Sequence, residues 1–402
     1  MTSAYKKPFY RARQKLMGKF MLKSQPKPLL YCGEGSVLQL CATIAQFGIN
    51  RLLLVTDKPL RDLGVMDSAV AALQAAGVET VIYDGVLPDP TLSVVNAGIA
   101  CFHEHGCDAV MAFGGGSSID AAKVIALAAG NQCQAQDCMG VGKCKAPARP
   151  FFAVPTTAGT GSEATFIAVI SDDTTHAKNA VIDPSLIPMA AALDAGLMRG
   201  LPPAITAATG MDALTHAIES YIGRWETPQT NFYGLAATRL VIDNLATACR
   251  DGSDIQARQS MALASFYGGL AITNALVGYV HAVSHNLGAR YGVPHGLGNA
   301  MVLPHVLELM KHDASKKLAE LAVHAQLGDA SQSDAVLAQA LIDKVVALND
   351  EIGIPRTTDV IRTEDIDELL DAIIAEGASY PCPRFLSRAE CRGILDSISG
   401  AA

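Results

Sequence analysis

Hydrophobic positions in the first half of the chain fall into short runs that alternate with longer amphipathic stretches. The runs at 51–57, 80–85 and 108–113 are apolar and rich in β-branched or leucine residues, which predicts buried strands. The stretches at 67–76 and 91–105 follow them and show helical periodicity. Strands that alternate with helices in this way predict βαβ units. We therefore expect an α/β domain with a parallel sheet.

A different pattern begins at the Pro202-Pro203 pair, where the alternation stops and helical periodicity takes over. Proline is tolerated in the first turn of a helix but not in its interior, so this pair marks a natural boundary. We predict an α/β domain over residues 1–204 and an all-helical domain over residues 205–402.

Composition indicates a globular protein and excludes several classes. The 402 residues are 50% hydrophobic and only 17% charged, which excludes disorder. A net charge of −8 argues against the basic surface of a nucleic-acid-binding protein. The apolar runs are much shorter than the roughly 20 residues that a membrane span needs. We therefore expect a small-molecule partner, with no nucleic acid and no membrane.

Cysteine usage favours a cytoplasmic location. Ten cysteines in a chain of this length, with no secretory signal, indicate reduced thiols rather than a disulfide scaffold. Cys133, Cys138 and Cys144 lie close together in the sequence. Their spacing contains no CxxC pair, so an ordinary polar loop is favoured over a zinc or redox cluster.

The N-terminal 33 residues are basic and contain no acidic residue. Mitochondrial transit peptides are rich in arginine, whereas lysine outnumbers arginine here and prolines interrupt the stretch. We interpret the segment as a basic arm on a cytoplasmic protein.

Histidine and aspartate side chains form two helical pairs in the second half of the chain. Asp212 and His216 are four residues apart, so both project from one helix face. His281 and His285 repeat this spacing, and His295 follows just beyond the expected end of their helix. A lone histidine is usually structural, but one carboxylate and several imidazoles on apolar helix faces are typical of a Zn²⁺ or Fe²⁺ site.

Three glycines at 114–116 follow the strand predicted at 108–113, and Ser117 opens a helix. Glycine allows close approach of a ligand, and a helix N-terminus offers N–H groups to phosphate. The sequence GGGSSIDAAK matches neither GxGxxG nor a Walker A loop. A tight structural turn and a diphosphate site both remain open.

Two further features lie at the carboxyl ends of predicted strands. The segment VPTTAGTGSE (154–163) fits a ligand-lining loop, with a plain loop as the alternative. Asp57 ends the run at 51–57 and could bind the ribose of an adenosine or simply cap a turn. Together with a metal site on a second domain, these features predict metal-assisted hydride transfer in a cleft between the domains.

The motifs resemble the iron-containing (group III) alcohol dehydrogenases over roughly residues 28–400. The resemblance is dense in GGGSSIDAAK, PTTAGTGSE, GMDALTHAIESY and NALVGYVHAVSHNLGARYGVPHGLGNA. It implies a Rossmann-like α/β domain followed by an all-α domain, the architecture shared with dehydroquinate synthases.

The resemblance also implies a role for each matching residue. His285 would be a non-ligand histidine near substrate and nicotinamide, a candidate for proton transfer. The implied metal ligands are Asp212, His216, His281 and His295. The implied cofactor-binding residues are Asp57, Gly115, Gly116, Ser117, Thr156, Thr157, Thr160 and Lys178.

Two positions depart from the family pattern. Ser118 stands where proline is frequent, which leaves the backbone N–H groups intact. Asp89 stands where asparagine is frequent, so we do not expect a cofactor contact through that side chain.

The predicted reaction is the reversible oxidation of a primary alcohol or diol to an aldehyde, with NAD as hydride acceptor. Asp57 favours NAD over NADP because its charge would repel a 2′-phosphate. Fe²⁺ is expected because the relatives that bind Zn²⁺ through three ligands generally lack a histidine at position 216; Zn²⁺ or another divalent ion is the alternative.

Other functions use a similar set of residues. A hydroxyacid–oxoacid transhydrogenase would use the same side chains, and a dehydroquinate synthase-like lyase or a non-catalytic NAD-binding protein is disfavoured. The segment 164–182 predicts a hairpin that could pair with a second copy, so a homodimer is a further hypothesis.

Overall fold

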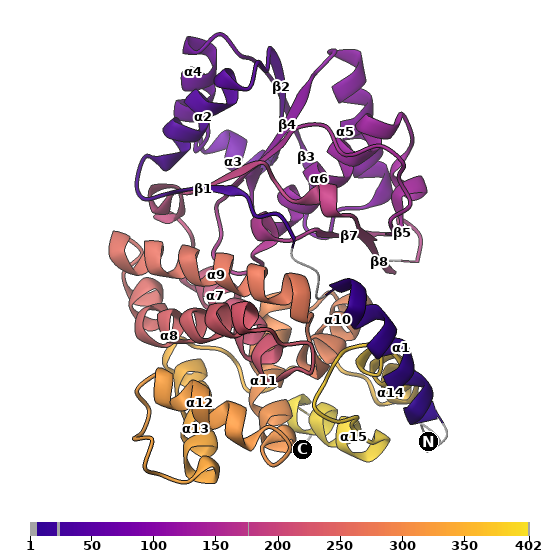
Figure 1. Cartoon of the computed structure of the whole chain (residues 1–402), viewed down its shortest axis with the longest axis vertical. Coiled ribbons are helices and arrows are strands. Elements are labelled where there is room, and N and C mark those ends of the chain that lie inside the picture. Colours follow the sequence, from indigo (N-terminus) through magenta and orange to yellow (C-terminus); the bar gives the residue numbers. More distant parts are fainter. Residues whose placement is uncertain (1–5, 22–24, 176, 401–402) are drawn as a thin grey trace. The chain divides into compact units, whose positions relative to one another are not determined.

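The computed structural model describes residues 6–21, 25–175 and 177–400, and their contacts form two compact units (Figure 1). The α/β unit comprises Gln25–Leu201 and Ser253–Ala262. The helical unit comprises Met1–Ser24, Pro202–Gly252 and Leu263–Ala402. This division falls near the predicted boundary at residue 204, but it places the N-terminal segment in the helical unit and Ser253–Ala262 in the α/β unit.

A six-stranded parallel sheet forms the centre of the α/β unit, with strand order β1-β9-β6-β4-β2-β3. Its strands are β1 (Leu29–Cys32), β2 (Arg51–Asp57), β3 (Glu79–Val86), β4 (Ala109–Gly114), β6 (Phe151–Pro155) and β9 (Ala190–Leu193). The three strands predicted at 51–57, 80–85 and 108–113 are confirmed as β2, β3 and β4. All of β4 and β6 is buried, which explains why such strands are continuous apolar runs in the sequence.

Helices cover both faces of this sheet (Figure 1). Alternate residues of β2 point to opposite faces: Leu53 packs with the α5 and α6 side chains, and Leu54 with those of α2 and α4. The helices are α2 (Ser36–Gln46), α3 (Lys58–Asp62), α4 (Asp67–Ala75), α5 (Leu92–Glu104) and α6 (Gly116–Asn131). The helices predicted at 67–76 and 91–105 are confirmed as α4 and α5.

The chain changes direction across the sheet between β2 and β4. From β2 it moves outward to the edge strand β3, and then returns to place β4 on the other side of β2. In open α/β sheets, ligands bind at such a switch point, beyond the carboxyl ends of the strands. Asp57 ends β2 and Gly114 ends β4, so both lie at this edge.

A small second sheet has the strand order β5-β8-β7. Strands β7 (Ile167–Ser171) and β8 (Lys178–Ile182) form an antiparallel hairpin, which confirms the prediction for 164–182, and β8 pairs in parallel with β5 (Gly140–Val141). Asp172 begins the turn, where its side chain accepts hydrogen bonds from the backbone N–H groups of Thr174 and Thr175. Dimerisation through this hairpin stays a prediction.

The helical unit is built around α7 (Pro203–Ile222), which begins at the predicted proline pair and is buried from Gly210 to its end. The other helices are α8 (Pro228–Arg250), α10 (Tyr279–Tyr291), α11 (His295–Met310), α12 (Ser315–His324), α13 (Asp334–Glu351), α14 (Ile366–Gly377) and α15 (Arg388–Ile398). Helix α9 (Ile255–Ala275) contributes residues to both units.

Among the described residues, no single helix combines the length and the apolar character needed to cross a membrane. Helices α9 and α10 taken together have the required length and composition, but the chain bends by 102° between them. The cytoplasmic location stays a prediction.

Within the basic N-terminal segment, residues Lys6–Met21 form helix α1, which packs within the helical unit (Figure 1). Arg11 donates hydrogen bonds to the carbonyls of Cys382 and Pro383, and its guanidinium lies 4.1 Å from the ring centre of Phe385. Gln14 is 5% exposed and donates to the carbonyls of Ala378 (3.1 Å) and Tyr380. The arm is therefore anchored by specific polar contacts to the segment after α14.

Replacing Gln14 by alanine removes one buried amide that serves two carbonyl groups, of which that of Ala378 is buried and that of Tyr380 is partly buried. We expect Gln14→Ala to lower the unfolding free energy of the helical unit by about 1–2 kcal/mol, because the carbonyls lose their donor. Denaturant unfolding followed by circular dichroism measures this change. Arg13→Ala, at an exposed position one residue away, is the control and should leave stability unchanged.

Candidate metal centre and cofactor site

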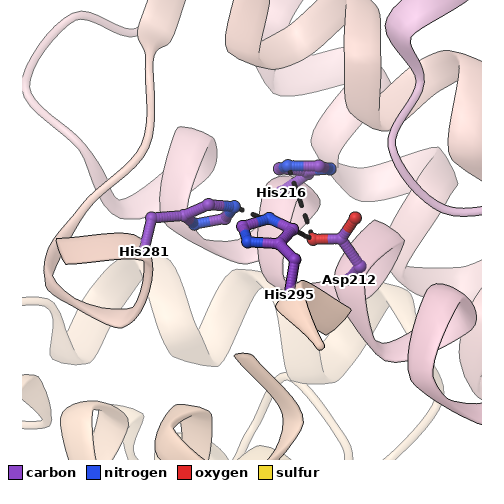
Figure 2. Close-up of side chains that lie close together, drawn as sticks. All are labelled: Asp212, His216, His281 and His295. Carbon is purple, nitrogen blue, oxygen red and sulfur yellow. Dashed lines mark ion pairs between the residues drawn. The ribbon is translucent and has the colours of Figure 1, made fainter. Parts of the chain in front are cut away.

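Four predicted ligand side chains converge from three helices of the helical unit (Figure 2). Asp212 and His216 lie one turn apart on α7, His281 lies on α10, and His295 is the first residue of α11. From Asp212 Oδ1 the distances to Nε2 are 3.3 Å for His295, 3.6 Å for His216 and 3.8 Å for His281. The structure therefore brings together the ligands that the i,i+4 spacing and the family resemblance indicated.

The geometry of these donors fits one divalent ion. The four ligand atoms all lie within 4.8 Å of one another. Donors that each lie about 2.0–2.2 Å from a shared ion must be separated by roughly 3–4.4 Å. One carboxylate oxygen with three imidazole nitrogens is a donor set for Fe²⁺ or Zn²⁺.

Asn299 supports the same conclusion. Its Nδ2 lies 2.8 Å from Asp212 Oδ1 and 3.2 Å from Nε2 of both His281 and His295. Three acceptor atoms from three helices thus face a single donor group. Their lone pairs point into one small volume, as ligands of one ion must.

Burial and neighbouring charges set the ionisation of the ligands. Burial, and then the charges of His216 and His295, lower the pKa of His281 well below its usual value, so this ring is neutral as a ligand must be. Burial raises the pKa of Asp212, but the charges of His216 and His295 outweigh it and hold the pKa below its usual range. His281 therefore offers a neutral imidazole beside the ionised carboxylate of Asp212.

Glu219 supports His281 from behind, a role that the sequence analysis missed. Its Oε2 lies 2.7 Å from His281 Nδ1, which directs Nε2 of the ring toward Asp212. The carboxylate also accepts backbone N–H bonds from Gly278 and Val280, each 2.8 Å long. Burial nevertheless raises its pKa to about 8. A spacing of seven residues from Asp212 places Glu219 two turns along the same helix face, and this signal could have identified it.

Gly278 is required by this arrangement. A Cβ atom at position 278 would lie 2.6 Å from Glu219 Oε1, closer than side chains pack. The glycine therefore lets the start of α10 approach the carboxylate closely enough to donate its backbone N–H groups.

His285 belongs to a second histidine–carboxylate pair, one turn after His281 on α10. Its Nδ1 lies 2.6 Å from Oε1 of Glu376 on α14, and its ring stacks at 5.1 Å on the ring of His295. Glu376 also accepts hydrogen bonds from Tyr380 (2.7 Å) and Asn286 (2.8 Å). The side chains of His285 and Glu376 are 27% and 25% exposed, so this pair is more accessible than the pair formed by His281 and Glu219. Nothing in the local sequence around Glu376 indicated its role.

In the α/β unit, the predicted diphosphate turn and the predicted hydroxyl-rich loop contact each other. Helix α6 begins at Gly116 after the N-cap Gly115, and no side chain caps it. A Cβ at 115 would lie 3.3 Å from Thr157 Oγ1, and one at 116 only 2.6 Å from Thr160 Cγ2. The glycines thus allow the loop to pack closely against the turn. They also leave the N-terminus of α6 without a side-chain cap, so its backbone N–H groups can bind an anion.

Two other residues of GGGSSIDAAK fix this loop to α6. The buried Lys123 donates to Ser162 Oγ and Thr165 Oγ1 (2.8 Å each) and to the carbonyl of Ile167 (2.7 Å), and burial lowers its pKa to about 8. Asp120 accepts from Ser162 Oγ. Thr156, which is itself buried, donates its backbone N–H to the carbonyl of Gly114. The loop is therefore held in a defined position beside the turn.

Asp57 and Lys178 have partners of their own. One oxygen of Asp57 accepts the Leu60 N–H at 2.9 Å and caps α3, which is the turn-capping role left open by the sequence. Lys178 Nζ lies 2.9 Å from Oδ1 of Asp89, whose φ of 52° is left-handed. The acidic side chain that departs from the family pattern thus faces a predicted cofactor residue.

Sequence comparison identifies relatives over nearly the whole chain. The family description "Iron-containing alcohol dehydrogenase" matches residues 28–195, and "Fe-containing alcohol dehydrogenase family, C-terminal" matches residues 206–399. Alcohol dehydrogenase 4 of Schizosaccharomyces pombe is 38% identical over 91% of this chain and 86% of its own length. Lactaldehyde reductase of Escherichia coli K12 is 36% identical over 88% of this chain and 93% of its own length.

Solved structures agree with the fold. A 1,3-propanediol oxidoreductase superposes with a TM-score of 0.89 at 35% identity, covering 93% of this chain and 98% of the other. Sulfoacetaldehyde reductase of Bifidobacterium kashiwanohense, solved with NAD⁺, gives a TM-score of 0.86 at 26% identity over 94% of this chain and 99% of the other. The predicted order of an α/β domain followed by an all-α domain is confirmed.

Glu219→Gln tests the support of His281. The amide oxygen of glutamine can still accept from the N–H at His281 Nδ1, but it cannot carry the negative charge that Glu219 has when ionised, so we expect metal affinity to fall by about 10–100-fold. Metal content after equilibration with a graded chelator series measures the change. Glu320→Gln, which alters a carboxylate bonded to Tyr221 on the same α7, should keep wild-type affinity; equal losses in both variants would contradict the role given to Glu219.

Proposed function

We propose a catalytic centre for this chain, which belongs to the iron-containing alcohol dehydrogenase family. The protein is a metal-dependent, NAD-linked oxidoreductase that interconverts an alcohol and an aldehyde, with iron and NAD as cofactors. The convergence of four donor atoms within 4.8 Å is the observation that carries the proposal. In it the iron ligands are Asp212, His216, His281 and His295.

The bound ion supplies Lewis-acid assistance, because it favours the deprotonated form of an alcohol. The chain's own residues prepare the site for this task. Glu219 holds the tautomer of His281 that directs Nε2 to the centre. Asp212 contributes the one negative charge among the ligands, so the site keeps a net positive charge when a divalent ion is present.

His285 is proposed to move the proton that the alcohol loses. Glu376 bonds to Nδ1, so Nε2 is the ring atom that exchanges a proton with the substrate side. The partial exposure of both side chains lets the proton pass on to water. The His285 ring, stacked on His295, lies beside the ligand set without belonging to it.

NAD is proposed to bind at the switch point of the sheet. The backbone N–H groups of Gly116 and Ser117 hold the diphosphate at the start of α6. Gly115 has no side chain, so the cofactor can approach the start of this helix closely. Thr156, Thr157 and Thr160 line the adjoining loop. Asp57 uses the carboxylate oxygen that is not engaged in capping α3 to accept from the ribose. Lys178 reaches the cofactor while it is paired with Asp89, and the carboxylate reduces the positive charge that Lys178 presents to the cofactor.

The proposed substrate class is short primary alcohols and diols, with their aldehydes. The names of the relatives, a lactaldehyde reductase and 1,3-propanediol dehydrogenases, support it. A lyase acting on a phosphorylated substrate would need uncommitted basic side chains near the metal. Arg239 and Arg290, two arginines of the helical unit, are already paired with Asp243 and Asp365.

Substitution of the ligands tests the proposal directly. We expect Asp212→Ala and His281→Ala to lose iron and to lower kcat/KM for NADH formation from short primary alcohols by roughly 10²–10³-fold, because Lewis-acid assistance supplies several kcal/mol. Protein purified anaerobically, with iron content measured in the same samples, provides both readouts.

The matched variants separate the roles. His285→Asn should lower kcat while iron stays bound, and His312→Ala, an exposed histidine of the same unit, should change neither. Full activity in Asp212→Ala or iron retained in both ligand variants would contradict the assigned centre. If the wild type binds iron and NAD, releases no NADH with any alcohol, and oxidises a hydroxyacid only when an oxoacid is added to take up the hydride, the transhydrogenase takes its place.

Asp57→Asn separates the two roles of Asp57. Asparagine caps a helix as well as aspartate, so α3 should remain intact while the negative charge disappears. We expect the ratio of kcat/KM for NAD⁺ over NADP⁺ to fall by roughly tenfold, equivalent to about 1.4 kcal/mol. Steady-state kinetics with both cofactors measure it. Asp62→Asn, an exposed residue of α3 paired with Lys58, is the control; an unchanged ratio in Asp57→Asn would place discrimination elsewhere.

A further inference from the structure

Three cysteine thiols converge at the C-terminal end of α6, outside the proposed catalytic centre. Cys138 Sγ lies 3.7 Å from Cys133 Sγ and 3.4 Å from Cys144 Sγ. All three sulfur atoms lie within 4.8 Å of one another. The sequence favoured an ordinary polar loop here, and the structure instead folds that loop so that its thiols share one site.

Hydrogen bonds on either side hold the three segments in place. The Asn131 side chain, at the end of α6, accepts from the backbone N–H groups of Lys145 and Ala146 and donates to the Ala146 carbonyl, which fixes the chain after Cys144. The short helix η1 (Ala135–Cys138) is closed by a capping box between Gln134 and Asp137. The thiols are therefore positioned before any ligand arrives, which lowers the entropic cost of binding.

Asn96 of α5 ties η1 to the rest of the unit. It accepts from the Ala135 N–H at 2.9 Å and donates to Gln136 at 3.2 Å. Cys138 is buried against the core of the α/β unit, whereas Cys133 and Cys144 are partly exposed. A small ion from solvent can therefore reach the two outer thiols, with the inner thiol beneath them.

The sulfur spacing fits coordination of a metal better than a disulfide. A disulfide has an S–S distance of about 2.05 Å, so either pair would have to close by more than an ångström. Sulfur atoms each about 2.3 Å from a tetrahedral zinc ion lie roughly 3.8 Å apart. Both measured distances, 3.4 and 3.7 Å, are close to that value.

We propose that Cys133, Cys138 and Cys144 bind one thiophilic metal ion, for which Zn²⁺ is the best-fitting common species. Binding forms three sulfur–metal bonds and releases the three thiol protons to solvent, with no change of oxidation state. A solvent molecule completes the fourth coordination position. Burial raises the pKa of Cys138 and of Cys144, so these groups are thiols until a cation displaces their protons.

The site is structural rather than catalytic. It lies at the opposite end of the 16-residue α6 from Gly116, a separation of about 24 Å along the helix. A bound ion would join the end of α6, η1 and the loop after β5, three segments that otherwise meet through hydrogen bonds. Binding should therefore stabilise the α/β unit while leaving hydride transfer unaffected.

Cobalt titration tests the proposal on the full-length, iron-loaded protein, because Co²⁺ substitutes for Zn²⁺ and gives a near-ultraviolet charge-transfer band only with sulfur ligands. The proposed iron site has oxygen and nitrogen ligands and cannot produce this band. We expect the band to saturate at one equivalent of Co²⁺ per chain and to disappear when Zn²⁺ is added. It should be absent in Cys138→Ser and strongly reduced in Cys133→Ser and Cys144→Ser.

Cys101→Ser is the matched control, because Cys101 is a partly exposed thiol of α5 that packs on the same core. It should keep the band, and Zn²⁺ should raise the Tm of this variant and of the wild type but not of Cys133→Ser. The two outer variants keep the test valid if Cys138→Ser fails to fold. Absence of a sulfur band in the wild type, its persistence in both outer variants, or a disulfide within the trio in anaerobically purified protein would overturn the proposal.

Discussion

The packing of the helical unit depends on one buried carboxylate, which needs positive charge around it. Asp212 is 2% exposed and lies on the most deeply buried helix of the unit. An ionised group in such a place is expensive unless cationic or strongly polar partners surround it. Asn299 donates to Asp212, and the Nε2 atoms of His216, His281 and His295 converge on the same carboxylate oxygen, so α7, α10 and α11 meet at this point. The same requirement explains why the arrangement suits a divalent ion, which would supply the missing charge most directly.

Helix α10 carries two histidines that each bond to a glutamate, and the two pairs differ in their surroundings. His281 and His285, one turn apart, each direct Nδ1 to a glutamate and so present Nε2. Glu219 is buried and accepts two backbone N–H groups, which suits a rigid ligand support. Glu376 is a quarter exposed and is bonded to side chains, which suits a group that exchanges protons. The proposed ligand pair and the proposed proton-carrying pair thus differ in burial: His281 and Glu219 are each 3% exposed, whereas His285 and Glu376 are 27% and 25% exposed.

Periodicity predicted much of the fold and the part of the site that lies within single helices. The i,i+4 pair Asp212 and His216 could be identified because one helix sets their geometry. The edge strand β1 and the alanine-rich β9 were missed because short strands with weak β-propensity have no distinctive pattern. Glu376 and Asn299 were missed for another reason: Glu376 meets His285, and Asn299 meets Asp212, only through the packing of different helices. The three cysteines at 133, 138 and 144 were considered as a cluster and disfavoured, because their spacing does not show that the loop folds their thiols together.

Helix α6 shows how one element can serve binding and stability at once. Its N-terminus needs glycine for the loop at 154–163 to pack closely, and the absence of a capping side chain leaves N–H groups for an anion. Such an end would fray if nothing else held it. Lys123 is buried with its ammonium bonded to oxygens of Ser162, Thr165 and Ile167, which fixes the helix at its middle, and Asn131 fixes its C-terminal end. The uncapped end can therefore remain ordered and ready for a ligand, because the polar contacts that stabilise the helix lie farther along it.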